Sequence, residues 1–293
     1  MPGLNRKAEI IKHSFWIICC AALWLGLMAS PASAQEEDVE ARGQPVQEVF
    51  QTGLVYPQER GEVQLSYTSR FSKGEDYSSL QTLLNLEYGI TDRWQVEIEW
   101  NAMSRRTATG EATARGKGDL QIGTQYSFMN MKRSNFHSAV GLEVTLPTGS
   151  VEKELGEGFI KYEPYFIIAR DLPKVHHMQV FSQVGVGFVQ RARRRAAGVE
   201  GEPAAHEFNF KAGMSAPFRR LVFTDEFNLS TNRWNHGGHE REMYATPGVV
   251  WRLPHNWEAS VGVPIGLTRD ADKFGEVLRL VYEFGTRRGG NAR

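Results

Sequence analysis

The sequence predicts an all-β fold: a transmembrane antiparallel up-and-down β-barrel of about 12 strands, preceded by a cleaved signal peptide. Segments of about ten residues alternate apolar and polar side chains from residue 61 to 285, and this is the pattern and length of a strand that crosses a bilayer. After the leader, no apolar stretch is long enough for a transmembrane helix. The connections between segments are short and long in turn, as periplasmic turns and extracellular loops are.

Residues 1–34 have the features of a secretory signal peptide. Basic residues come first, an apolar run covers 15–27, and small residues lead up to Ala34. The alternative is an N-terminal transmembrane anchor, for which the apolar run is short. The two cysteines, Cys19 and Cys20, both lie in this leader. The mature chain therefore has no disulfide, no thiol nucleophile and no thiolate metal site.

The charge balance excludes an electrostatic nucleic-acid binder. The chain has 34 Lys and Arg against 34 Asp and Glu, and loss of residues 1–34 leaves 31 against 33. The mean hydropathy of −0.40 is that of a soluble protein. A barrel can have this value because only every second residue faces lipid.

The hairpin over 118–150 shows the alternation most clearly and supplies the fourth and fifth strands. Counting back from its turn, we expect Gln121 opposite Glu143 and Ser127 opposite His137. The other ten strands are expected near 61–72, 78–90, 92–103, 159–170, 177–190, 206–216, 219–230, 242–252, 256–267 and 274–284.

Loop lengths sort the two ends of this barrel. The long connections cover 104–117, 148–158, 191–205 and 231–241, which predicts the extracellular side. Two residues disturb the pattern. Asp225 falls in a lipid-facing position, which a β-bulge or a location near the outer rim would relieve. Pro247 lies within a strand, so a bulge or a local break is expected there.

The segments outside the barrel are an N-terminal lead-in, residues 35–60, and a C-terminal tail, residues 286–293. The lead-in is acidic at first and weakly patterned later. We favour a plain periplasmic tail, and the alternative is a short docked helix or plug that uses Val46, Val49, Phe50 and Leu54.

The inward face carries many charged and polar side chains. Charges inside a barrel must be hydrated or paired. One interpretation is therefore a water-filled pore that selects small solutes, and the other is a salt-bridged core that only maintains the barrel. The candidates to line the lumen are Arg93, Glu97, Glu99, Gln121, His137, Glu143, Lys161, Glu163, Lys211 and Arg279.

One long loop is strongly basic. Its guanidinium groups could hold lipopolysaccharide phosphates at the outer surface, and a solvated loop is the equal alternative. The candidate residues are Arg191, Arg193, Arg194 and Arg195.

Catalytic and metal sites are not expected. His236, His239 and Glu240 share a loop, but one short histidine pair is more often a polar loop than a metal site. Ser138 and Ser182 face outward without an outward histidine beside them. We therefore predict that the protein is not an enzyme, binds no cofactor, and has no catalytic or metal-ligating residues.

The strands GDLQIGTQY and VGLEVTLPTGS and the turn in YGITDRWQVEIEW resemble the proteobacterial outer-membrane family named for the MetA pathway of phenol degradation. The resemblance covers residues 80–150. It implies a β-barrel that transports aromatic compounds, and it identifies no ligand residue. The chain departs from outer-membrane barrels in that Phe284, its expected assembly signal, is followed by nine more residues.

Together these features predict a protein of the bacterial outer membrane that takes up small, aromatic or amphipathic solutes passively. The alternative is a non-conducting surface barrel whose loops bind lipopolysaccharide or a partner. The expected partners are outer-membrane lipid and lipopolysaccharide, a small-molecule solute and the barrel-assembly machinery.

Overall fold

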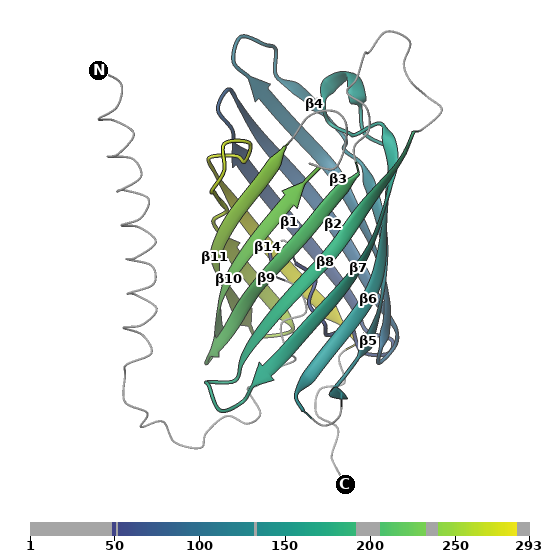
Figure 1. Ribbon diagram of the computed structural model, residues 1–293, viewed down its shortest axis with the longest axis vertical. Helices are drawn as coiled ribbons and strands as arrows, with labels where there is room; N and C mark the ends of the chain where they lie inside the picture. The colour runs from purple at the N-terminus through teal and green to yellow at the C-terminus, as the bar shows by residue number, and fades with distance from the viewer. Residues whose placement is uncertain (1–48, 51, 132–133, 192–205, 233–239, 286–293) are drawn as a thin grey trace, which may run out of the picture. The chain divides into compact units, whose positions relative to one another are not determined.

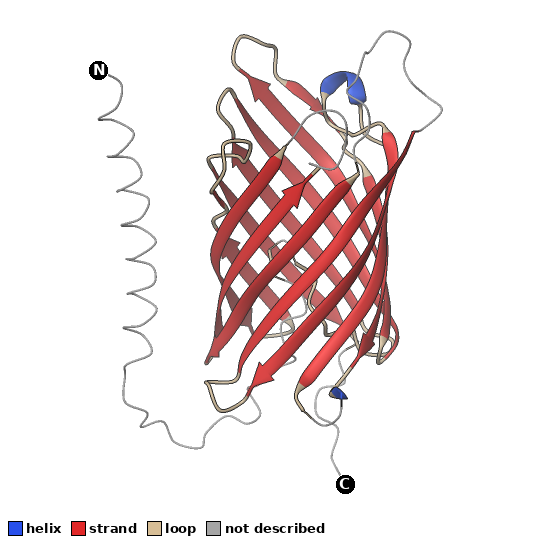
Figure 2. Ribbon diagram, viewed as in Figure 1, coloured by secondary structure: helices blue, strands red, loops and turns tan. Residues whose placement is uncertain are grey.

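The computed structural model describes residues 49–50, 52–131, 134–191, 206–232 and 240–285. Within these residues, twelve antiparallel strands form a closed β-barrel, so the predicted fold is confirmed (Figure 1). Almost everything else is turn or loop (Figure 2). No helix in these described ranges is long and apolar enough to span a membrane.

Each strand hydrogen-bonds to its neighbours in chain order, and β1 pairs with β14 to close the barrel. The eleventh wall position is shared by β12 and β13, while β4 and the 3-10 helix η2 lie in the loops. The elements are β1 Val63–Lys73, β2 Tyr77–Thr91, β3 Trp94–Ala108, β4 Ala114–Gly116, β5 Leu120–Phe128, β6 Phe136–Leu146, η2 Val151–Lys153, β7 Phe159–Leu172, β8 Met178–Arg191, β9 Glu207–Phe218, β10 Leu221–Thr231, β11 Arg241–Leu253, β12 Trp257–Gly262, β13 Ile265–Gly266 and β14 Phe274–Phe284.

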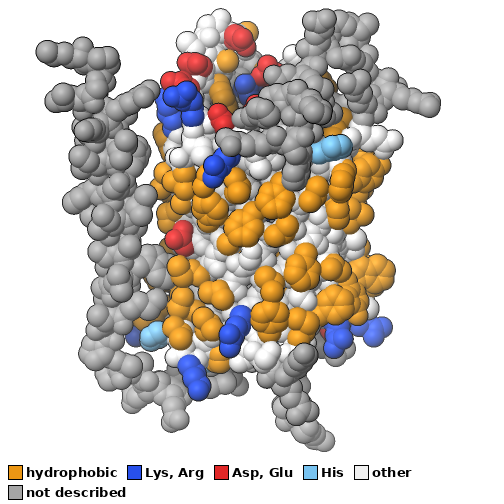
Figure 3. Space-filling model, viewed as in Figure 1, with side chains coloured by type: hydrophobic (Ala, Val, Ile, Leu, Met, Phe, Trp, Pro, Cys, Tyr) orange, Lys and Arg blue, Asp and Glu red, His pale blue; other side chains and the backbone are white. Residues whose placement is uncertain are grey.

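The outer face of the barrel is apolar. Large side chains at alternate positions remain well exposed, among them Leu65, Leu86, Ile98, Phe166 and Leu278. Hydrophobic side chains form a band across the visible face, and Lys and Arg side chains lie above and below it (Figure 3). Such a band is the surface that a bilayer requires of a barrel.

The third strand is longer than predicted. It continues to Ala108, and β4 pairs back onto Ser104–Arg106, so part of the predicted 104–117 loop is a hairpin extension. Within β3, Thr82 pairs with Met103 and Leu83 with Asn101, which leaves one extra residue between the two pairs. This bulge reverses which residues of β3 face outward beyond that point, because side chains alternate with period two.

The predicted register of the hairpin was wrong by two residues. Gln121 pairs with Thr145, Gly123 with Glu143, and Ser127 with Ala139. The shift arises because the turn extends into the first two residues of β6, which have no partner on β5. The Asn130 backbone N–H donates to His137 Nδ1 at 3.0 Å and so holds His137 in the turn.

The bulge expected at Asp225 is absent from the described strands, since β10 pairs without interruption with both β9 and β11. Asp225 lies opposite Pro247, in the middle of the outward row of β10. The break expected near Pro247 occurs instead in its neighbour, between β12 and β13. Pro247 accepts a hydrogen bond from Val263 N–H at 3.0 Å but has no N–H to donate in return, and Pro264 follows at once.

Residues of the motifs that carried the family resemblance form hydrogen bonds that hold the β6–β7 loop in place. Asp119 accepts hydrogen bonds from the backbone N–H groups of Gly149 and Glu157, both at 2.8 Å. Thr148 Oγ1 donates to the Gly118 carbonyl at 3.1 Å. The GDL and LPTGS segments therefore fix the two ends of the β6–β7 loop.

Candidate functional site

Inward-facing carboxylates form a row that crosses adjacent strands in register. Glu87 of β2 pairs with Glu97 of β3, and Glu97 pairs with Gly123 of β5. Gly123 pairs with Glu143 of β6, which pairs with Glu163 of β7. A Cβ atom on Gly123 would overlap the Glu97 side chain, so this glycine gives the carboxylate its space. We call Glu87, Glu97, Glu143 and Glu163 the acidic row.

Basic side chains contact both ends of the acidic row. Lys161 Nζ lies 3.5 Å from Glu163 and 3.4 Å from Glu207. At the other end, Arg279 Nη2 lies 3.9 Å from Glu87. Glu163 also accepts a hydrogen bond from Asn209 Nδ2 at 2.9 Å. The ends of the row are therefore neutralised by neighbours on the wall.

The described part of the lead-in lies inside the barrel. We call residues 49, 50 and 52–60 the luminal segment. The Val49 carbonyl accepts from Arg279 Nη1 at 3.4 Å. Glu226, in the middle of β10, has a carboxylate that accepts from Phe50 N–H at 2.6 Å and from the Thr52 hydroxyl at 2.9 Å. Glu226 is 1% exposed, so the bonds form away from bulk water, where charge-assisted hydrogen bonds are strong.

The Phe50 ring lies against two glycines of the barrel wall. Gly248 and Gly262 pair with one another across β11 and β12. A Cβ atom on Gly248 would overlap the ring, and one on Gly262 would lie 2.7 Å from Phe50 Cγ. The paired glycines therefore form the surface that accepts the ring.

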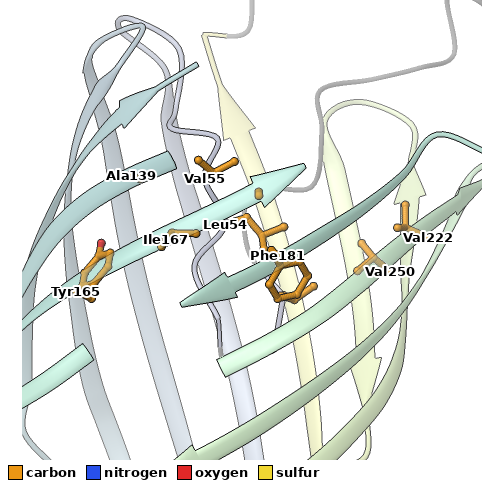
Figure 4. Packing of buried hydrophobic residues seen from close by; sticks show 10 residues of the cluster. Leu54, Val55, Ala139, Tyr165, Ile167, Phe181, Val222 and Val250 are labelled. Atoms are coloured by element: carbon orange, nitrogen blue, oxygen red, sulfur yellow. The ribbon is translucent and has the colours of Figure 1, made fainter. Parts of the chain in front are cut away.

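The next residues pack on an apolar part of the wall (Figure 4). Leu54 and Val55 are 1% and 0% exposed and belong to one cluster of buried hydrophobic residues. Gln125 Nε2 donates to the Leu54 carbonyl at 3.0 Å. The wall residues of this cluster are Ala139, Tyr165, Ile167, Ala169, Phe181, Val222 and Val250.

Near the short-turn end of the barrel, Tyr56 reaches the β7 strand. Its hydroxyl donates to Asp171 Oδ2 at 2.5 Å, and its ring centroid lies 5.3 Å from that of His137. Burial, assisted by the hydrogen bond to Asp171, raises the pKa of the Tyr56 phenol, so the group stays a donor. Since His137 Nδ1 accepts from Asn130, its Nε2 carries the proton toward Asp171, 3.1 Å away.

The segment ends against β1, β2 and β3. Gln58 is fully buried; its N–H donates to Gln95 at 2.8 Å, and its amide donates to Gln64 at 3.0 Å and to Glu87 at 3.1 Å. The carbonyl of Glu59 occupies the space that a side chain at Gly89 would need. From Phe50 to Gln58 the chain thus contacts strands on opposite sides of the lumen.

Beyond the luminal segment, toward the long-loop end, the lumen is a cavity of about 560 Å³. Phe50 and Leu54 form one boundary, and Leu155 lies near the loops. Most of its wall is polar. The charged lining residues are Arg70, Glu87, Glu97, Glu99, Arg105, Arg106, Glu143, Glu154, Lys211 and Asp272.

The structure distributes the ten candidate lumen residues among three places. Five line the cavity: Glu97, Glu99, Gln121, Glu143 and Lys211. Four lie on the inner wall in the contacts described above: His137, Lys161, Glu163 and Arg279. The predicted position of Arg93 was wrong, because this residue lies exposed in the two-residue turn between β2 and β3 and not on the lumen wall.

Several interpretations fall outside the described residues. They concern the signal peptide 1–34, the first part of the lead-in, the tail 286–293 and the histidine loop. Of the basic loop, only the backbone of Arg191 is described, as the last residue of β8. In the described residues, no group of three or more His, Cys, Asp or Glu side chains could hold a metal ion.

Sequence reasoning missed the anchors of the luminal segment, chiefly the roles of Glu226, Gly248 and Gly262. One signal was available: the strand pattern places Gly262 inward, and an inward glycine opposite another leaves a gap that a ring can fill. The contact of Phe50 with Glu226 joins residues 176 positions apart, and no local pattern encodes it.

Comparison with known proteins gives the following matches. The sequence model of the HAEPLYID-like family matches residues 57–283. The COG4313 outer membrane channel from Pseudomonas putida F1 is 13% identical, with a TM-score of 0.60, over 81% of this chain and 100% of that chain. The β domain of the Bordetella autotransporter BrkA is 12% identical, with a TM-score of 0.50, over 77% of this chain and 100% of that one. No curated protein matches.

These likenesses support the fold of outer-membrane barrels and, at such low identity, no more than the fold. The matching family model is not that of the MetA pathway, so the family that the hairpin resembled is not confirmed.

Proposed function

Since the chain belongs to the HAEPLYID-like family and has the fold of outer-membrane barrels, we propose that it is an outer-membrane channel for passive uptake of small polar solutes. The observation that carries the proposal is the cavity of about 560 Å³ with a charged wall, located between the luminal segment and the long-loop end. In a structural core, such charges would be packed against one another.

In this proposal the long-loop end faces the outside and the short-turn end faces the periplasm. A leader removed after Ala34 directs the chain to the outer membrane, and the barrel-assembly machinery reads the strand that ends at Phe284. Lipid surrounds the apolar band, and lipopolysaccharide phosphates meet the basic loop that begins at Arg191.

The resemblance of the hairpin to the MetA phenol family favours aromatic solutes. The cavity wall supports a polar solute instead, because carboxylates and amides such as Glu97, Glu99 and Gln121 dominate it. An aromatic ring would remove water from these groups without satisfying their hydrogen bonds.

Conductance in planar bilayers and the swelling of proteoliposomes test the proposal. We expect small, cation-favouring currents and faster swelling in polar than in aromatic solutes of equal size. The double substitution Glu97→Gln and Glu99→Gln should reduce cation selectivity, measured as the reversal potential in a salt gradient. Glu111→Gln, at an exposed turn between β3 and β4, is the matched control.

The second candidate is a non-conducting surface barrel, and the luminal segment is the observation that favours it. A barrel that never conducts, even after the segment is released by the substitution described in the Discussion, would support this alternative and refute the channel.

A further inference from the structure

Four polar side chains form a contiguous patch on the cavity wall, near the long-loop ends of β1 and β2. Arg70 pairs with Gln81, and Ser72 pairs with Ser79. Residues two apart in a strand face the same side, and neighbouring strands lie about 4.8 Å apart, so the four side chains are close together. All four line the cavity. We call Arg70, Ser72, Ser79 and Gln81 the donor patch.

Arg70 is a partly buried cation without a counter-ion. Its side chain forms no ion pair and no hydrogen bond within the described residues, and its Nε is buried. A guanidinium that is removed from water without an anion costs free energy. Since the protein encloses the Nε, the terminal nitrogens are the atoms left to meet a ligand. A carboxylate fits them, because it can accept two parallel hydrogen bonds from a guanidinium.

The other cations that line the cavity are satisfied in other ways. Arg106 Nε lies 2.9 Å from Glu154. Lys211 interacts electrostatically with Glu143. Arg105 is exposed, so water solvates its charge. The guanidinium of the donor patch is therefore the lining cation to which the described residues supply neither a carboxylate nor full access to water.

The rest of the donor patch can also donate hydrogen bonds to an anion. The hydroxyl oxygens of Ser72 and Ser79 lie 2.8 Å apart, so one hydroxyl donates to the other and one hydrogen is left for a further acceptor. The Gln81 side chain forms no hydrogen bond with the other described residues. A bound carboxylate would accept from these groups as well as from the guanidinium.

The wall on either side of the donor patch is uncharged or basic where the structure describes it. The two rows of the patch continue on β14 to Val277 and Gly275, and on β3 to Ser104 and Arg106. Asp272 reaches the cavity from a loop, and it already accepts from the Tyr77 hydroxyl at 2.6 Å. An anion at the patch would therefore meet no carboxylate of the neighbouring strands.

Hydrogen-bond acceptors lie deeper in the cavity. One row, formed by Thr68, Leu83 and Asn101, separates the donor patch from them. Glu99 and Gln121, which pair across β3 and β5, line the cavity beyond that row. Hydroxyl groups of a solute would face these acceptors while its carboxylate binds at the patch. Inorganic cations would still be favoured along the acidic row, so the site is compatible with cation-favouring currents.

We propose that the donor patch binds the carboxylate of a small hydroxylated organic acid, with Arg70 as the residue that recognises it. This rests on the proposed function, in that the lumen is the path of the solute. The site would select organic acids over neutral polyols of the same length.

Titration of the detergent-solubilised full chain with gluconate, followed by saturation-transfer NMR of the ligand, tests the proposal without requiring conduction. Glucitol is the matched neutral ligand, since an alcohol replaces the carboxylate. We expect saturable binding of gluconate, and binding of glucitol that is weaker by about tenfold or more.

Substitutions of Arg70 test the role of the guanidinium. Arg70→Gln should weaken gluconate binding by about tenfold or more. Arg70→Lys keeps the charge but loses the paired donors, so it should weaken binding by about threefold. Arg115→Gln changes an exposed arginine of β4 that does not line the cavity, and it should leave binding unchanged. Heat-modifiable migration on gels checks that each variant is folded.

Equal binding of gluconate and glucitol would overturn the proposal, and so would equal binding of gluconate by the wild type and Arg70→Gln. Inorganic phosphate is the comparison anion, and phosphate that binds more tightly than gluconate would overturn the choice of a carboxylate. Gluconate binding without conductance would leave the site in place and refute the channel. Conductance without gluconate binding would refute the site and leave the channel in place.

Discussion

The substitution Glu226→Gln should release the luminal segment and open the barrel. The carboxylate accepts hydrogen bonds from two donors of the segment, Phe50 N–H at 2.6 Å and the Thr52 hydroxyl at 2.9 Å. Glutamine has the same shape but only one accepting oxygen. Its NH₂ group would face one of the two donors.

The expected size of the effect follows from these contacts. Loss of one hydrogen bond to a charged group costs roughly 1.5–3 kcal/mol. Since each 1.4 kcal/mol is a factor of ten, the ratio of open to closed barrels should rise by about 10- to 150-fold. Planar-bilayer recordings measure this ratio as the total open time divided by the total closed time. The single-channel conductance of the open state should not change.

A disulfide provides the converse test. Phe50 Cγ lies 2.7 Å from the Cβ position of Gly262, so Cβ atoms at the two positions are at most about 4.2 Å apart, within the range of a disulfide. Phe50→Cys with Gly262→Cys should keep the barrel closed until a reductant is added. Each single cysteine variant is the control for loss of the ring or the glycine.

The interpretation would be refuted if Glu226→Gln left the open time unchanged in a folded barrel. Currents of equal size through the oxidised and the reduced cysteine pair would refute it as well, since the segment would then not obstruct the path.

Three further predictions concern the stability of the wall and one loop. Gly141→Val should lower the free energy of unfolding by roughly 1–3 kcal/mol, because a Cβ atom there overlaps the ring of Tyr165, and thermal unfolding in detergent measures it. Asp119→Ala removes the acceptor of two backbone hydrogen bonds from the loop 148–158, so limited proteolysis should cut that loop faster while the barrel stays intact. Asp225→Leu should stabilise the barrel in lipid by up to about 2 kcal/mol, measured as a higher urea midpoint of reversible folding into vesicles; an unchanged midpoint would place this carboxylate outside the apolar layer.

Much of the barrel wall could be predicted because the alternation of apolar and polar side chains is a local feature of the sequence. In a strand such as Phe274–Phe284, one apolar and one polar face follow from alternate residues alone, and the observed bounds agree with the prediction. The sorting of short and long connections likewise needs only the order of the strands. The two-residue error in the hairpin register arose because the turn extends to His137, and the change of facing in β3 arose because a bulge adds one residue. Such shifts depend on hydrogen bonds that the alternation does not encode.

The candidate site was predicted only in part. Glu97, Glu99 and Glu143 were identified as inward carboxylates, since facing is a consequence of the strand pattern. The acidic row of Glu87, Glu97, Glu143 and Glu163 was not predicted, because it requires the registers of β2, β3, β5, β6 and β7 together.

The sequence by itself determined the antiparallel barrel and the residues that face its lumen. Only the tertiary structure decided what occupies that lumen. The luminal segment is bound by Glu226, Gly248 and Gly262, which lie far from Phe50 in the chain and meet it only once the barrel has closed. Period-two alternation is a property of neighbouring residues, whereas a plug depends on which strands face one another across the barrel.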